Sequence, residues 1–125
     1  MQEVRYRKGE VIFSEGEPGT QCYRIVEGRV GISLGLAGAL KRGQSEPIAE
    51  CGPGEIIGAM SVISKGRRSA SATAIEPTRC LSYSEDEIID ILENDPLEAL
   101  TYIRTLIRHQ RESNRTMAWG NGRRR

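Results

Sequence analysis

The chain contains few of the residues from which disulfide frameworks, metal centres and catalytic triads are built. Of its 125 residues, three are Cys and one is His. Cys22, Cys51 and Cys80 are odd in number and lack the spacing of a zinc site, so we expect buried, reduced thiols. A single histidine, His109, cannot supply a clustered-histidine metal site. We therefore expect no metal, no cofactor and no enzymatic activity.

Long apolar runs are also lacking. No apolar segment approaches the ~18 residues that cross a membrane, and Met1 is followed by charged residues rather than by a signal-type segment. We therefore expect a cytoplasmic protein without membrane contact. The formal net charge is +1, yet residues 96–125 carry seven basic and two acidic side chains. Because the rest of the chain is acidic, we expect no nucleic-acid binding through this basic end.

A chain of this length has room for one domain, which can bury about two-thirds of the surface that the unfolded chain exposes. We divide it into a β-rich part at residues 1–95, a long helix of the same domain at 96–119 and a basic tail at 120–125. No stretch after residue 95 offers a second core, so we expect no separate DNA-binding domain.

Short runs of β-branched and aromatic residues alternate with glycine-containing turns through the first two-thirds of the chain. This pattern predicts a β-barrel or jelly roll of about eight short antiparallel strands. The two-residue connection Glu27-Gly28 favours a hairpin, and residues 76–78 are expected to join the last two strands as a pair. Residues 35–46 are expected to form a mobile loop. The expected strands are 11–13, 22–26, 29–33, 47–51, 70–75 and 79–83.

Two helices are expected after the strands. Ser84, with Glu87 three residues later, forms a capping-box pattern that starts a short helix reaching Asn94. Asp95 as the N-cap and Pro96 at the first helical position open a long helix to about residue 118. Its apolar positions Leu100, Ile103 and Ile107 begin a coiled-coil-like seam. The seam continues in steps of three and four with a more polar second half, at Gln110, Asn114 and Met117.

Residues 58–74 combine a glycine, one helical turn, a polar bulge and a strand that starts near Arg68. Free backbone N–H groups after a glycine turn can face an anion, and a guanidinium ten residues later can meet the same group with two hydrogen bonds. This arrangement can bind one phosphate. The alternative, which has no binding role, is an ordinary turn followed by a solvated arginine.

The segment resembles the phosphate-binding cassette of the cyclic nucleotide-binding domain, with the cassette region at 54–74. The order of glycine turns, strands and helices over residues 4–118 is similar to that family as well. The resemblance implies a cAMP- or cGMP-binding regulatory domain in which Arg68 meets the cyclic phosphate. Where the family has a ribose-binding glutamate, this chain has Ala59. The expected ligand-binding residues are Gly58, Ala59, Met60, Ser61, Arg68, Ser69, Ala70 and Ser71.

On the long helix, the resemblance implies that Tyr102, Ile103, Leu106 and Gln110 cover the base, although apolar residues at this spacing are more often core. Without a carboxylate at position 59, we expect weak nucleotide binding that Ala59→Glu should tighten. The leading hypothesis is a stand-alone regulatory module in signal transduction that signals through its C-terminal helix and forms a homodimer there. The alternative is a degenerate fold that has lost the nucleotide and acts as a protein-interaction or scaffold domain.

Overall fold

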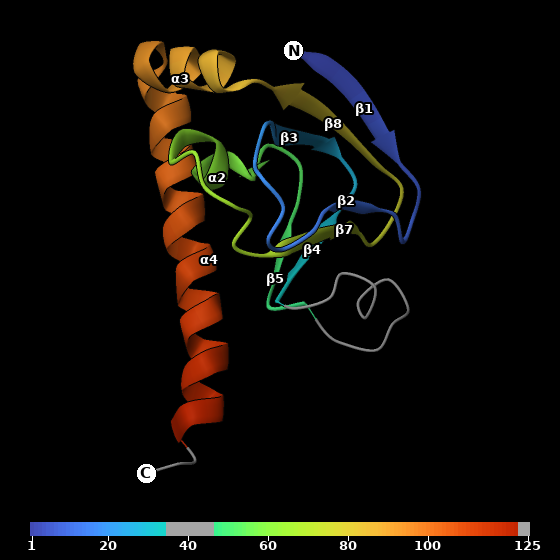
Figure 1. The fold of residues 1–125 in the computed structure, drawn as a ribbon, viewed down its shortest axis with the longest axis vertical. Coiled ribbons are helices and arrows are strands. Elements are labelled where there is room, and N and C mark those ends of the chain that lie inside the picture. The colour runs from blue at the N-terminus through green and yellow to red at the C-terminus, as the bar shows by residue number, and fades with distance from the viewer. Residues whose placement is uncertain (35–46, 123–125) are drawn as a thin grey trace.

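Two four-stranded antiparallel sheets form a β-roll in a computed structural model that describes residues 1–34 and 47–122 (Figure 1). Within the C-terminal helix, the side chains of 109, 110 and 112–122 lie outside that description. One sheet has the order β1-β8-β3-β6 and the other β2-β7-β4-β5. The strands are β1 (Gln2–Tyr6), β2 (Val11–Phe13), β3 (Cys22–Glu27), β4 (Val30–Ser33), β5 (Ala49–Cys51), β6 (Ile56–Ile57), β7 (Ser71–Ala74) and β8 (Thr78–Tyr83).

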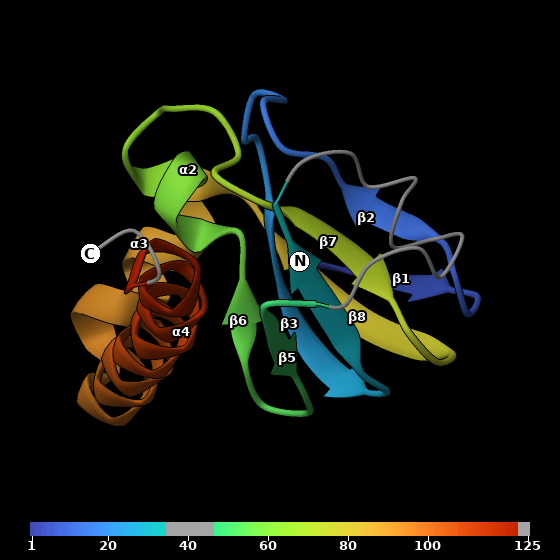
Figure 2. The same cartoon turned by 90° about the horizontal axis from the view of Figure 1, so that it is seen from below.

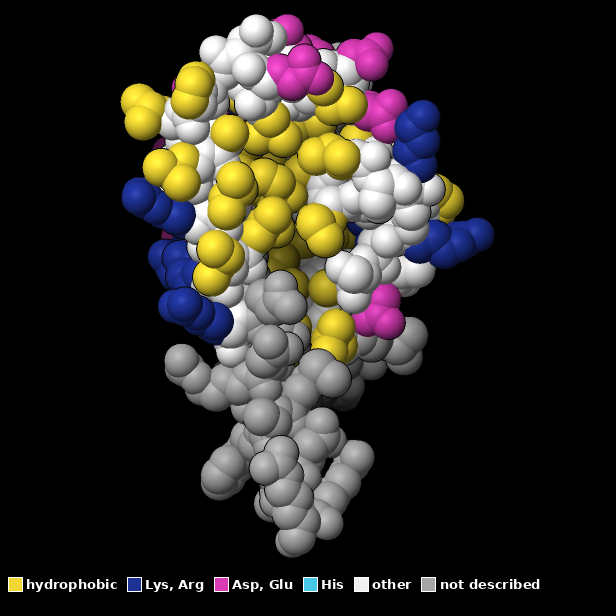
Figure 3. Space-filling view, turned by 90° about the vertical axis from the view of Figure 1, so that its left-hand side faces the viewer, with side chains coloured by type: hydrophobic (Ala, Val, Ile, Leu, Met, Phe, Trp, Pro, Cys, Tyr) yellow, Lys and Arg dark blue, Asp and Glu magenta, His cyan; other side chains and the backbone are white. Residues whose placement is uncertain are grey.

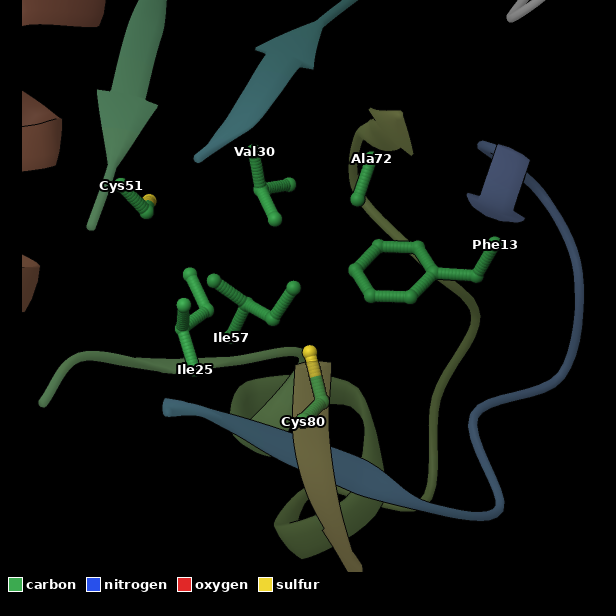
Figure 4. Packing of buried hydrophobic residues seen from close by; sticks show 7 residues of the cluster. All are labelled: Phe13, Ile25, Val30, Cys51, Ile57, Ala72 and Cys80. Carbon is green, nitrogen blue, oxygen red and sulfur yellow. The ribbon is translucent and has the colours of Figure 1, made fainter. Parts of the chain in front are cut away.

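The core between the two sheets takes one side chain from each strand except β1 (Figure 4). Three of the seven side chains are small, namely two cysteines and one alanine. As expected, all three cysteines are free and buried, and Cys51 and Cys80 belong to this core. The cluster consists of Phe13, Ile25, Val30, Cys51, Ile57, Ala72 and Cys80.

The predicted pairing of consecutive strands is wrong at two places. β3 and β4, joined by Glu27 to Arg29, lie in different sheets, and so do β7 and β8. The connection between β3 and β4 instead packs on the one between β7 and β8, at 75–77: the Ile75 N–H and the hydroxyl of Thr78, the first residue of β8, both donate to the carbonyl of Arg29. Gly28 has φ +102°, and an added Cβ would lie 2.5 Å from the carbonyl oxygen of Pro77. The turn is therefore a crossing between sheets rather than a hairpin.

Two strands have no counterpart among the expected ones. β1 is largely exposed and polar, so its alternation carries little apolar signal, and β6 has only two residues. The strand at 47–51 is shorter than predicted and begins at Ala49. The expected mobile loop at 35–46 lies outside the described residues.

Three helices gather on one side of the β-roll (Figure 2). They are α2 (Ala59–Ile63), α3 (Glu85–Asn94) and α4 (Pro96–Gly122). The capping box at Ser84 and Glu87 is confirmed, and Asp95 accepts a hydrogen bond from the Glu98 N–H at the start of α4. α4 continues past residue 119 into the expected basic tail. No helix among the residues described is long and apolar enough to cross a membrane.

A second cluster of buried side chains fastens these helices to the β-roll. It draws from β3, β6 and β8 on one side and from all three helices on the other, so the helices share one core with the sheet. The cluster consists of Cys22, Ile56, Ala59, Val62, Tyr83, Ile88 and Tyr102.

Removing the α3 cap should destabilise the domain because α3 packs into this second cluster. We expect Ser84→Ala to lower the free energy of unfolding by about 0.5–2 kcal/mol, the usual value of such a cap. Urea denaturation followed by circular dichroism measures it. Thr101→Ala, at an exposed position of α4, is the control and should change stability by no more than about 0.5 kcal/mol. Equal effects of the two changes would contradict the role of the cap.

Candidate functional site

Arg68 is the buried cation around which the site is built. It lies between α2 and β7, and only 6% of its surface is exposed. Its Nη1 donates to the Gly58 carbonyl at 2.9 Å and to the Ser61 hydroxyl at 3.0 Å, and its Nη2 donates to the Gln21 carbonyl at 2.6 Å. These three contacts fix the guanidinium against the turn that opens α2.

An aromatic ring completes the surroundings of this side chain. The guanidinium carbon of Arg68 lies 4.1 Å from the centroid of the Phe13 ring, which is cation–π geometry. Burial lowers the pKa of Arg68 from its ordinary value, although an arginine stays protonated at any physiological pH. Within the described residues no carboxylate pairs with it, and its buried Nε–H has no hydrogen-bond partner. Carbonyl dipoles and a ring therefore stabilise a full positive charge that still lacks an anion.

A cavity of about 390 Å³ opens beside Arg68, between the β-roll and α4. Its walls are predominantly apolar, and its polar side chains are Arg68, Ser61, Ser69 and Tyr102. No carboxylate lies among its described lining residues. Apolar walls with one cation and a few hydroxyl groups suit a small ligand that carries one anionic group.

Six of the eight expected ligand-binding residues line this cavity, and two do not. Met60 is exposed at its edge, while Ala59 and Ser71 have no exposed surface. Ala59 packs in the second cluster, and the Ser71 hydroxyl accepts a hydrogen bond from the Glu15 N–H. A glutamate at position 59 would thus enter a buried cluster, which adds a folding cost to the expected gain in affinity. The six residues are Gly58, Met60, Ser61, Arg68, Ser69 and Ala70.

The long helix closes one side of the cavity with only part of the set expected from the sequence. Tyr102 and Leu106 line it, whereas Ile103 is 51% exposed and is not among the lining residues. The side chain of Gln110 lies outside the described residues. The helix therefore faces the cavity with one aromatic and one aliphatic residue.

Sequence reasoning missed the parts of the site that come from distant segments. Phe13 lies on β2, and Gln21 contributes only its backbone carbonyl, so neither has a local motif. Ile32, Ile48 and Ala49 form apolar walls of the cavity and read in the sequence as ordinary strand residues. Only the alternation of apolar and polar residues along their predicted strands could have indicated that these side chains face inward.

A larger hollow of about 680 Å³ lies at another part of the β-roll, lined by charged residues such as Arg79, Glu27 and Glu76. Two of its four basic lining residues are paired within the chain: Arg79 pairs with Glu27 and Glu3, and Arg5 pairs with Glu3. Its size reflects open surface between turns. The smaller cavity, with its unpaired buried cation, is the stronger candidate site.

Gly58 should be indispensable for seating Arg68. It has φ +81°, and an added Cβ would lie 2.5 Å from Arg68 Nη1 and 3.0 Å from the Phe13 ring. Gly54→Ala is a matched control, because Gly54 also has positive φ but has nothing within 4 Å of the added Cβ. Urea denaturation should show a loss of roughly 1–2 kcal/mol for the control and a clearly larger loss for Gly58→Ala. Equal losses would mean that Gly58 serves the turn alone.

Comparisons with known proteins agree with this geometry. The family model of the cyclic nucleotide-binding domain matches residues 3–95. The chain is 34% identical over 113 residues to the cyclic AMP receptor protein of Thermus thermophilus and 30% identical over 118 residues to a CRP-like cAMP-activated global transcriptional regulator of Mycobacterium tuberculosis. These matches cover 90% and 94% of the chain but 50% and 51% of the two relatives. The chain thus spans about half the length of these relatives.

Solved structures give the same result. The catabolite activator protein of Thermus thermophilus superposes with a TM-score of 0.70 at 32% identity, over 94% of this chain and 54% of that one. The cAMP-bound form of the EAL enzyme Bd1971 superposes with a TM-score of 0.63 at 30% identity, over 97% of this chain and 32% of that one. The sequence match, the β-roll with its terminal helices and the buried cassette arginine lead to one conclusion: this chain belongs to the cyclic nucleotide-binding domain family.

Proposed function

We propose that this domain is a cytoplasmic, non-catalytic regulatory module that binds a cyclic nucleotide, cAMP or cGMP, beside Arg68 and signals through α4. The observation that carries the proposal is the buried Arg68 guanidinium, which lines a cavity and has no carboxylate partner among the described residues. A cyclic phosphate would supply the missing negative charge. The Nε–H of Arg68 has no hydrogen-bond partner among the described residues, and a guanidinium can bind two oxygens of a phosphate through a pair of N–H groups.

The nucleotide should bind weakly. No carboxylate in the described lining of the cavity can accept a hydrogen bond from a ribose hydroxyl. The absence of one charge-assisted hydrogen bond, about 1.5–3 kcal/mol, reduces affinity roughly ten- to a hundredfold. The apolar walls remain available to the base.

The two faces of α4 support the proposal that the domain signals through this helix. Tyr102 and Leu106 line the cavity, while Leu100, Ile103 and Ile107 form an exposed apolar stripe. Figure 3 shows hydrophobic side chains gathered on this face, with basic side chains along one edge. A ligand that touches the inner face can shift the helix and so change what the outer face binds. A second copy of the domain is the partner that we propose for the stripe.

A second candidate function is a protein-interaction domain of the same family that has lost its nucleotide. Two observations favour it: Ala59 is buried in the core, and three N–H groups of Arg68 already donate within the chain. In that case the guanidinium would be a structural group that holds α2 on β3.

Calorimetric titration with cAMP and cGMP separates the two functions. Arg68→Lys should weaken binding roughly ten- to a hundredfold, because lysine keeps the charge but cannot form the two-pronged contact. Arg67→Lys is the control: Arg67 is exposed, donates to the Gly16 carbonyl and should leave affinity unchanged. Circular dichroism checks that both variants fold. No heat with either nucleotide, or equal affinity for Arg68→Lys and the unaltered chain, would favour the interaction domain.

The homodimer is tested by sedimentation velocity. Burial of three aliphatic side chains per chain, roughly 1.5–3 kcal/mol each, should outweigh repulsion between the neighbouring arginines Arg104 and Arg111. We expect a dimer that Ile103→Glu converts to a monomer. Thr101→Glu, at an exposed position on another face of α4, is the control and should leave the dimer intact. A monomeric unaltered chain would contradict the proposed partner.

A further inference from the structure

Tyr102 is the polar side chain that α4 contributes to the lining of the cavity. It is 6% exposed, and its ring packs in the same buried cluster as Ala59. Ala59 of α2 and Tyr102 of α4 thus belong to one core, which brings together the two helices that border the cavity.

Two ion pairs attach α4 to the β-roll in the position in which Tyr102 lines the cavity. Glu98, one helical turn before Tyr102, pairs with Arg24 of β3. Arg108, farther along the helix, pairs with Glu55 and also donates to the Glu50 carbonyl. Both ion pairs attach α4 to the β-roll, one before and one after Tyr102 along the helix.

The hydroxyl of Tyr102 is available for a ligand. Within the described residues it forms no hydrogen bond, whereas Ser61 is engaged with both Arg68 and the Gly58 carbonyl. Ser69 lines the cavity directly after Arg68, on the side where the anion is expected. Burial raises the pKa of Tyr102 well above its ordinary value, so the phenol stays neutral and can both donate and accept.

We propose that the Tyr102 hydroxyl hydrogen-bonds the sugar hydroxyl of the bound nucleotide and makes this site selective for a ribose over a deoxyribose. The inference rests on the proposed nucleotide-binding function. A 3′,5′-cyclic nucleotide has one free sugar hydroxyl, at the 2′ position. With the phosphate on Arg68, the sugar is the ligand's remaining hydroxyl-bearing part inside an otherwise apolar cavity. Tyr102 thus takes the role of sugar recognition that no carboxylate of the described lining can fill.

Calorimetry with cAMP and 2′-deoxy-cAMP tests the proposal. For the unaltered chain we expect cAMP to bind roughly two- to tenfold more tightly, the value of one neutral hydrogen bond. Tyr102→Phe keeps the ring, so it should weaken cAMP by the same factor and leave 2′-deoxy-cAMP unchanged. Ser69→Ala is the comparison variant and should affect both ligands equally.

The outcomes are distinct. Equal affinity of the unaltered chain for the two nucleotides overturns the role of Tyr102 and leaves nucleotide binding intact. Equal weakening of both ligands by Tyr102→Phe also overturns it, since a merely structural ring would act in this way. If neither nucleotide binds the unaltered chain, the proposed function itself fails and this inference fails with it.

Discussion

A buried guanidinium without a counter-charge is the constraint on which the rest of this structure depends. A cation removed from water is expensive unless dipoles or an anion replace its hydration. Here two backbone carbonyls, a serine hydroxyl and an aromatic face replace part of the hydration of Arg68. Residues around it are small because space is short: a Cβ on Gly19 would lie 2.2 Å from the Ser61 hydroxyl oxygen. The charge that remains uncompensated is what makes the neighbouring cavity the candidate ligand site.

The same guanidinium connects segments that are distant in the chain. It links the residue before β3 with the turn before α2, and it covers a ring from β2. α4 then closes the cavity from outside the β-roll and is attached at Glu98 and Arg108. The ligand would lie between a rigid strand scaffold and a helix whose outer face is apolar. The proposed function therefore couples ligand binding and dimer formation through this one helix.

Local sequence patterns predicted the helices and the cassette. They did not predict which strands pair with each other in the folded structure. The Ser84 capping box and the Pro96 helix start were correct because both depend on neighbouring residues alone. The hairpin at Glu27-Gly28 was wrong because a turn motif does not tell whether the chain returns to its own sheet or crosses to the other.

The candidate site also has a part that local sequence patterns predicted and a part that depends on the tertiary structure. Six cassette residues line the cavity as their spacing suggested, but Ala59 packs in a cluster that includes Tyr102, forty-three positions away. Phe13 and the Gln21 carbonyl carry no motif at all, since one acts through its ring face and the other through its backbone. Only the assembled β-roll brings them to the cassette arginine.

The central claim is that an anion completes the surroundings of Arg68, and the Arg68 Nε–H reports on this directly. In nitrogen-15 spectra of arginine side chains, Arg68→Lys identifies its signal by removal. Titration with cAMP should move that signal downfield and saturate, as a new hydrogen bond to phosphate forms, while the Arg67 signal stays in place. An Arg68 signal that does not move while other resonances respond to cAMP would contradict the account.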